Sequence, residues 1–131
     1  MTLRAALLTF SAFAIACGSS PTSPSNGGGG GGGGGGVQTT TITITSAGVN
    51  PRQIIVSAGA RVTFFNQDTR QHEMNSDPHP THGDCPAIDD VGFLAPGQTK
   101  LTGNLTVVRT CGYHDHQNDT NTSLQGQIIV Q

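Results

Sequence analysis

After residue 16 the sequence lacks any hydrophobic run long enough to cross a membrane, for which a helix needs roughly 20 apolar residues. It also lacks an excess of positive charge. Of six Lys and Arg residues one, Arg4, lies near the N-terminus, which leaves five against eight Asp and Glu, and such a mildly acidic chain is a poor nucleic-acid binder. No segment has a convincing helical repeat, which argues against a helical fold. Neither a nucleophile elbow nor a helical metalloprotease motif is present, so we do not expect an enzyme.

The N-terminal segment indicates export. Arg4 precedes an apolar run over residues 5–16 that ends in small residues, as in a cleaved signal peptide. Residues 14–17, Ala-Ile-Ala-Cys, resemble the lipobox of bacterial lipoproteins, with Ala14 where leucine is usual. The resemblance implies that residues 1–17 are a lipoprotein signal peptide ending at Cys17, which becomes lipidated. The lipid would anchor the protein to a membrane, with the domain facing the periplasm or the cell exterior. Ordinary secretion with a cut near Cys17 is the alternative.

The next segment predicts a flexible tether. Residues 18–36 contain Ser, Pro, Thr and Asn followed by ten consecutive glycines, a composition that cannot bury enough apolar surface to fold. Residues 37–131 remain, which is the size of one domain. We therefore expect a tethered, monomeric domain whose only membrane contact is the lipid anchor.

The domain has the pattern of short strands. Residues 39–45, Thr-Thr-Thr-Ile-Thr-Ile-Thr, are all β-branched and place Ile42 and Ile44 on one face, with the period of two that is typical of a half-buried strand. Further short strands are predicted between turn residues, at 54–56, 61–65, 91–94, 100–105, 107–111 and 124–130. This pattern favours an all-β, antiparallel Greek-key β-sandwich. Residues 73–90, rich in Pro, His and Asp, are expected to form a long functional loop.

All five histidines lie in two groups. His72, His79 and His82 form one, and His114 and His116 form the other. Imidazole is the commonest protein ligand for copper and zinc, and a metal site draws its ligands from separate segments so that folding sets their geometry. The grouping predicts a metal site between the two segments, with Asp115 as a hydrogen-bond acceptor that orients a ligand histidine.

Three pieces of the sequence resemble the cupredoxin family. Residues 49–68 carry a proline, a strand, a glycine turn, a second strand and an asparagine, and His72 then stands where the first ligand would be. Residues 111–114, Cys-Gly-Tyr-His, are similar to the family's Cys-x-x-His, and residues 124–128 are similar to its Met-x-Gly-x-Val. The resemblance implies one copper ion held by His72, Cys111 and His114, with Leu124 at the axial position.

Cys85 leaves the ligand set open. If Cys17 is lipidated, the mature domain has just two cysteines in an oxidising compartment, which also predicts a Cys85 to Cys111 disulfide. That bond would remove the thiolate of a blue copper site. Copper could then be held by nitrogen alone, through His72 and His114 with neighbours among His79, His82 and His116, and zinc suits such a site too.

Two functions agree with these residues. In the first, the protein carries one electron between redox partners outside the cytoplasmic membrane, with exchange through His114. In the second, it holds or delivers copper to an exchange partner, and the extra histidines serve binding. A third interpretation is an interaction sandwich with surface histidines, because sandwich architecture alone implies no function.

Overall fold

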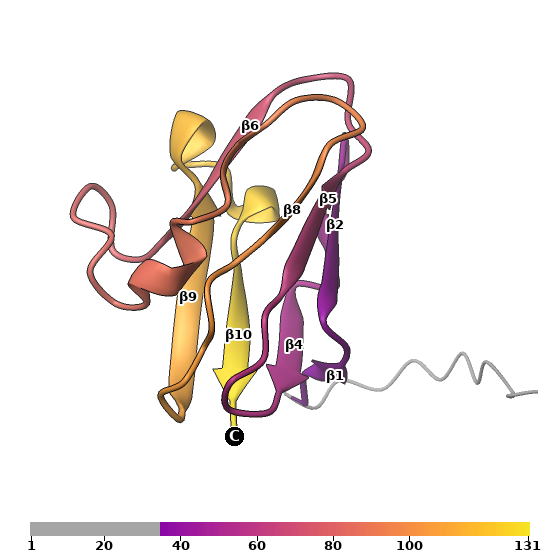
Figure 1. The fold of residues 1–131 in the computed structure, drawn as a ribbon. Helices are drawn as coiled ribbons and strands as arrows, with labels where there is room; N and C mark the ends of the chain where they lie inside the picture. The colour runs from indigo at the N-terminus through magenta and orange to yellow at the C-terminus, as the bar shows by residue number, and fades with distance from the viewer. Residues whose placement is uncertain (1–34) are drawn as a thin grey trace, which may run out of the picture. The chain divides into compact units, whose positions relative to one another are not determined.

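The computed structural model describes residues 35–131 (Figure 1). The expected signal peptide, the lipidation of Cys17 and nearly all of the expected tether lie outside these residues. No helix among the described residues is long and apolar enough to cross a membrane.

The described chain folds into two β-sheets. The larger has the strand order β1 (Val37–Gln38), β4 (Gln53–Val56), β10 (Gly126–Val130), β9 (Arg109–Asp115), β6 (His72–Ser76) and β7 (Gly92–Leu94). The smaller has the order β3 (Gly48–Asn50), β2 (Thr41–Thr45), β5 (Thr63–Asn66) and β8 (Thr99–Leu101). Three short 3₁₀ helices complete the described part: η1 (Pro86–Ile88), η2 (His116–Asn118) and η3 (Thr122–Leu124).

The apolar residues of the alternating strands form the core between the sheets. Ile42 and Ile44 of β2 and Ile54 of β4 are completely buried. Phe64 of β5 meets Tyr113 of β9 edge to face, with ring centroids 5.2 Å apart. Aromatic pairs in this arrangement contribute about 0.5–1.5 kcal/mol beyond their buried area. The predicted all-β sandwich is confirmed, with mixed sheets, because β4 pairs in parallel with β1 and β10, and β2 with β5.

Several predicted boundaries were wrong. Strand β9 does not end at Cys111 but continues to Asp115, and the expected strand over residues 100–105 is confined to β8. The expected loop over residues 73–90 begins later, because residues up to Ser76 belong to β6, which pairs with β9. Residues 77–91, here called the histidine loop, connect β6 to β7 beside β9 (Figure 1). The extension of β9 proves decisive for the metal site.

Candidate metal centre

Four of the five histidines come together in one cluster. His79 and His82 lie in the histidine loop, His114 lies near the end of β9, and His116 begins η2. One ring nitrogen from each lies within 4.8 Å of one from every other. His114 is buried, His82 and His116 are half-buried, and His79 is exposed. Two segments more than thirty residues apart thus supply two imidazoles each.

The His114 ring is held with one nitrogen free. Its Nδ1 lies 2.7 Å from Oδ1 of Asp77, whose carboxylate accepts the hydrogen bond when Nδ1 carries the proton. Its Nε2 is buried and has no hydrogen-bond partner among the described residues. A buried polar atom without a partner costs about 1–3 kcal/mol. A metal ion bound to Nε2 would satisfy this atom, so the cluster fits a metal.

Asp77 reaches His114 because residue 112 is glycine. In β9, Gly112 and His114 lie on the same face of the strand, since side chains alternate. A Cβ atom at position 112 would collide with the Asp77 carboxylate. The Asp77 backbone N–H also donates to the Gly112 carbonyl, at 3.0 Å. The roles of Asp77 and Gly112 were not predictable from the sequence, since a glycine between a cysteine and a tyrosine gives no signal of this contact.

We expect Asp77→Ala to weaken Cu(II) binding about 10- to 100-fold, the usual effect of removing a carboxylate that orients a ligand histidine. Gly112→Ala should act in the same direction by displacing Asp77, and Asp77→Asn should retain part of the affinity because its amide oxygen still accepts from Nδ1. Competition with a chelator of known affinity measures the change. Asp90, an exposed carboxylate of the same loop, supplies the control Asp90→Ala. Equal losses of Cu(II) affinity in Asp77→Ala and Asp90→Ala would show that Asp77 acts only through its negative charge and does not orient His114.

The other three rings are already close to one another. Nδ1 of His116 lies 3.0 Å from Nε2 of His82, and the His79 and His116 ring centroids are 4.8 Å apart. The Ser76 hydroxyl donates to the His82 carbonyl at 2.7 Å, which fixes the loop backbone there. Burial holds the pKa of the His82 imidazole below its usual range. The carboxylate of Asp89 acts to raise this pKa, and the neighbouring imidazoles act to lower it. Neutral imidazole is the form that binds metal.

His72 lies outside this cluster. Its side chain is completely buried, with Nδ1 2.9 Å from Oδ2 of Asp115 and Nε2 3.1 Å from Oδ2 of Asp68. Ionised carboxylates only accept hydrogen bonds, so both contacts are satisfied when both ring nitrogens carry protons. We call these three residues the buried triad.

Both carboxylates of the buried triad are strongly hydrogen-bonded. Burial alone would raise the pKa of Asp115, but hydrogen bonds from the N–H of Glu73, from His72 and from two residues of η2 outweigh that effect and lower the pKa. Burial alone would also raise the pKa of Asp68, but the hydrogen bonds from the Thr69 N–H and the His72 ring outweigh burial, so this pKa is lowered too. Asp115 was predicted to orient a ligand histidine. In the structure it orients His72, which lies outside the four-histidine cluster. Through Gln117 N–H it also caps η2, which begins at His116.

Cys111 is bonded to Cys85. Their sulfur atoms form a disulfide with 5.8 Å between the Cα atoms and a sequence separation of 26. In the β9–β10 register Cys111 lies opposite Ile128, which is completely buried, so Cys111 faces the core. His114, three residues later on the same strand, has the opposite parity and points to the other face.

No protein-family model and no curated protein sequence matches this chain. Solved structures do match. A novel purple cupredoxin from Nitrosopumilus maritimus is 16% identical with a TM-score of 0.55, over 71% of this chain and 100% of that one. Oxidized plastocyanin from Dryopteris crassirhizoma is 16% identical with a TM-score of 0.54, over 70% and 99%. An oxidized amicyanin mutant is 17% identical with a TM-score of 0.53, over 70% and 80%. This chain has a cupredoxin-like fold.

The cupredoxin-like domain does not bring together the ligand set that the family resemblance implied. His72 is held by two carboxylates, Cys111 is in a disulfide, and His114 points away from both, so the three residues expected as a trigonal set do not meet in the structure. The physical reason is the length of β9, because a Cys-x-x-His that remains within a strand places its two side chains on opposite faces. Leu124, expected at the axial position, is buried in the hydrophobic core at the end of η3. The structure instead joins His114 with all three of the additional candidates.

Proposed function

We propose that this cupredoxin-like protein binds one copper ion as Cu(II) through His79, His82, His114 and His116, and that it holds the ion or passes it to an exchange partner. The observation that carries the proposal is the buried, unpartnered Nε2 of His114 within a cluster of four imidazoles. Imidazole donors suit copper, zinc and nickel, and Cu(II) stands highest among these in the usual order of affinities.

The donor set favours holding or delivery of copper over electron transfer. A one-electron carrier must bind both oxidation states well, and the soft thiolate that favours Cu(I) is absent from this cluster because Cys111 is in the disulfide. The likeness to plastocyanin and amicyanin supports electron transfer as the second candidate, through the fold alone. The open side of the cluster, where His79 is exposed, offers a path for exchange of the ion.

The location is part of the proposal. Residues 1–17 have the features of a lipoprotein signal peptide, so we propose that Cys17 anchors the protein outside the cytoplasmic membrane and that residues 18–36 let the domain reach its partner. A disulfide also agrees with an oxidising compartment.

Titration of the full chain with Cu(II) tests the function. We expect one equivalent to bind tightly, with nitrogen hyperfine structure in the electron paramagnetic resonance spectrum and without the intense blue absorption of a copper thiolate. An intense blue colour would instead support the electron carrier with a Cys111 ligand. Failure of one equivalent of Cu(II) to bind, or tighter binding of Zn(II) than of Cu(II) in direct competition, would contradict the copper proposal.

A further inference from the structure

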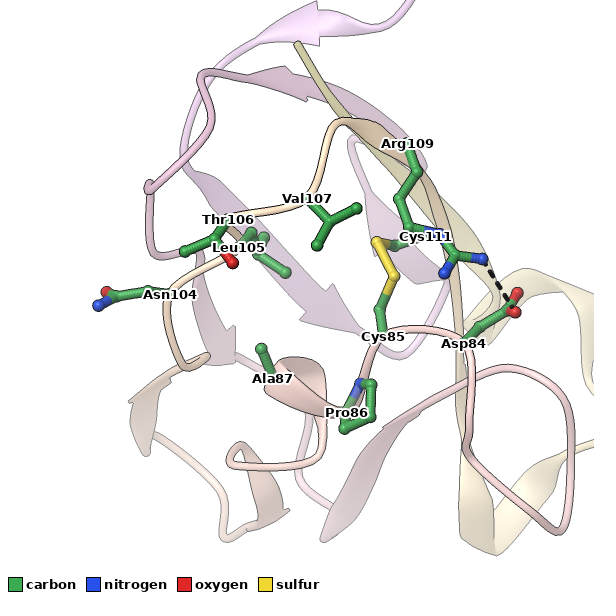
Figure 2. Close-up of a pocket in the computed structure, with 10 residues that line it drawn as sticks. All are labelled: Asp84, Cys85, Pro86, Ala87, Asn104, Leu105, Thr106, Val107, Arg109 and Cys111. Carbon is green, nitrogen blue, oxygen red and sulfur yellow. Dashed lines mark hydrogen bonds and ion pairs between the residues drawn. A yellow bond between two sulfur atoms is a disulfide. The ribbon is translucent and has the colours of Figure 1, made fainter.

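A cavity opens over the Cys85–Cys111 disulfide (Figure 2). One wall is formed by residues 104–107, the other by residues 84–87, and the disulfide and Arg109 lie at one end. The cavity measures about 170 Å³, which is less than a drug-sized pocket but enough for the reactive end of a small thiol. Cys85, 7% exposed, is the more accessible of the two cysteines, since Cys111 is 1% exposed.

The disulfide joins the same two segments that the metal would join. Cys85 lies three residues after His82 in the histidine loop, and Cys111 lies three residues before His114 in β9. Beside the disulfide, an ion pair between Arg109 of β9 and Asp84 of the histidine loop, at 3.1 Å, also joins the two segments. Both of its side chains are more than 40% exposed, and exposed ion pairs hold weakly. The disulfide is therefore the covalent restraint that, beside the hydrogen bonds of Asp77 and Ser76, keeps His79 and His82 facing His114 and His116.

We propose that the cavity is a thiol–disulfide exchange site, and that reduction of Cys85–Cys111 by a thiol entering it weakens the four-histidine site and releases the metal. This inference rests on the proposed function. Exchange sites of this kind depend on access to one sulfur of the disulfide and on a local positive charge that favours the thiolate. The cavity supplies access to Cys85, and the Arg109 guanidinium, which is paired with the Asp84 carboxylate at 3.1 Å, supplies the positive charge at the cavity.

The exchange balances with two thiol groups as the reductant. The first, as a thiolate, attacks Cys85 Sγ and forms a mixed disulfide, while the Sγ–Sγ bond breaks and Cys111 leaves as a thiolate. The second attacks the sulfur that the first contributed, which frees Cys85 and leaves the reductant as a disulfide. The two protons of the reductant thiols end on Cys85 and Cys111, so the cysteines gain the two electrons that the reductant loses.

Reduction does not supply a replacement ligand. The freed Cys111 thiol still faces the core, on the other side of β9 from His114, and its position opposite Ile128 is set by the β9–β10 register. Release of the loop therefore lowers the affinity of the cluster, and nothing in β9 compensates for it.

The first arm of the test asks whether a thiol reaches the disulfide in the folded full chain. We expect glutathione to produce two additional free thiols per chain, those of Cys85 and Cys111, without denaturant and at a rate proportional to its concentration. Arg109→Gln should slow the anionic glutathione several-fold more than it slows the neutral 2-mercaptoethanol. Thiols that appear only after denaturation, or equal slowing of both reagents, would overturn the exchange site.

The second arm measures the metal without any thiol that could reduce it. The full chain with Cys85→Ala and Cys111→Ala should bind Cu(II) at least tenfold more weakly than the oxidised wild type. The serine pair provides a second chain without the disulfide, and circular dichroism and the near-ultraviolet signal of Tyr113 verify that either is folded. Arg109→Gln, which keeps the disulfide, should change the affinity less than threefold. Equal affinity of a folded chain without the disulfide and the wild type overturns the inference, whereas a wild type that binds no Cu(II) overturns the proposed function itself.

Discussion

Replacement of His114 by alanine should lower the Cu(II) affinity of the full chain by more than about 100-fold. Removal of a group that merely orients a ligand costs about 10- to 100-fold, and the loss of the ligand itself should exceed that. His114 is the most buried member of the cluster, and its Nε2 has no hydrogen-bond partner in the part of the chain that the structure describes. Chelator competition, followed by electron paramagnetic resonance of the copper-loaded chain, measures the change.

The control for this experiment is Gln117→Ala. Gln117 is an exposed neighbour of His116 in η2, and its side chain makes no hydrogen bond within residues 35–131. We expect the Gln117→Ala chain to bind Cu(II) with the affinity of the wild type. Should His114→Ala retain full affinity while remaining folded, the metal would not be held by the four-histidine cluster.

Replacement of His72 by alanine should reduce the free energy of unfolding by about 3–5 kcal/mol, the usual cost of removing one member of a buried ionic network. The substitution leaves the carboxylates of Asp115 and Asp68 buried without the imidazole that contacts both. It also opens a cavity where the ring was completely enclosed. Urea unfolding of the metal-free chain, with the slope of the transition checked for constancy, measures the loss.

The two histidine variants should therefore behave in opposite ways. At a temperature where it remains folded, His72→Ala should bind Cu(II) with nearly the affinity of the wild type, because its ring lies outside the cluster. Glu73→Gln, a half-buried neighbour in β6, should change the free energy of unfolding by no more than about 0.5 kcal/mol. If His72→Ala were instead stable and lost copper, the metal would lie at the position that the family resemblance implied.

Local patterns explain which parts of the fold were predictable. The alternation over residues 39–45 and the apolar run near the C-terminus identified β2 and β10, because period-two burial depends on neighbouring residues only. Strand β6 was missed because its sequence, His-Glu-Met-Asn-Ser, has no strand pattern, and pairing with β9 determines its conformation. The end of β9 was misplaced for the same reason, since residues 113–115 are extended through their partners in β6 and β10.

The amino-acid sequence by itself determined that the histidines form two groups, that both groups lie in one all-β domain and that two cysteines of that domain are available for a disulfide. Only the tertiary structure decided which histidines meet. Sequence spacing cannot give this result, because the face on which a side chain lies depends on where the strand ends. With β9 continuing to Asp115, His114 points to the histidine loop, while Cys111 and Asp115 point to the core, where Cys85 and His72 complete the disulfide and the buried triad.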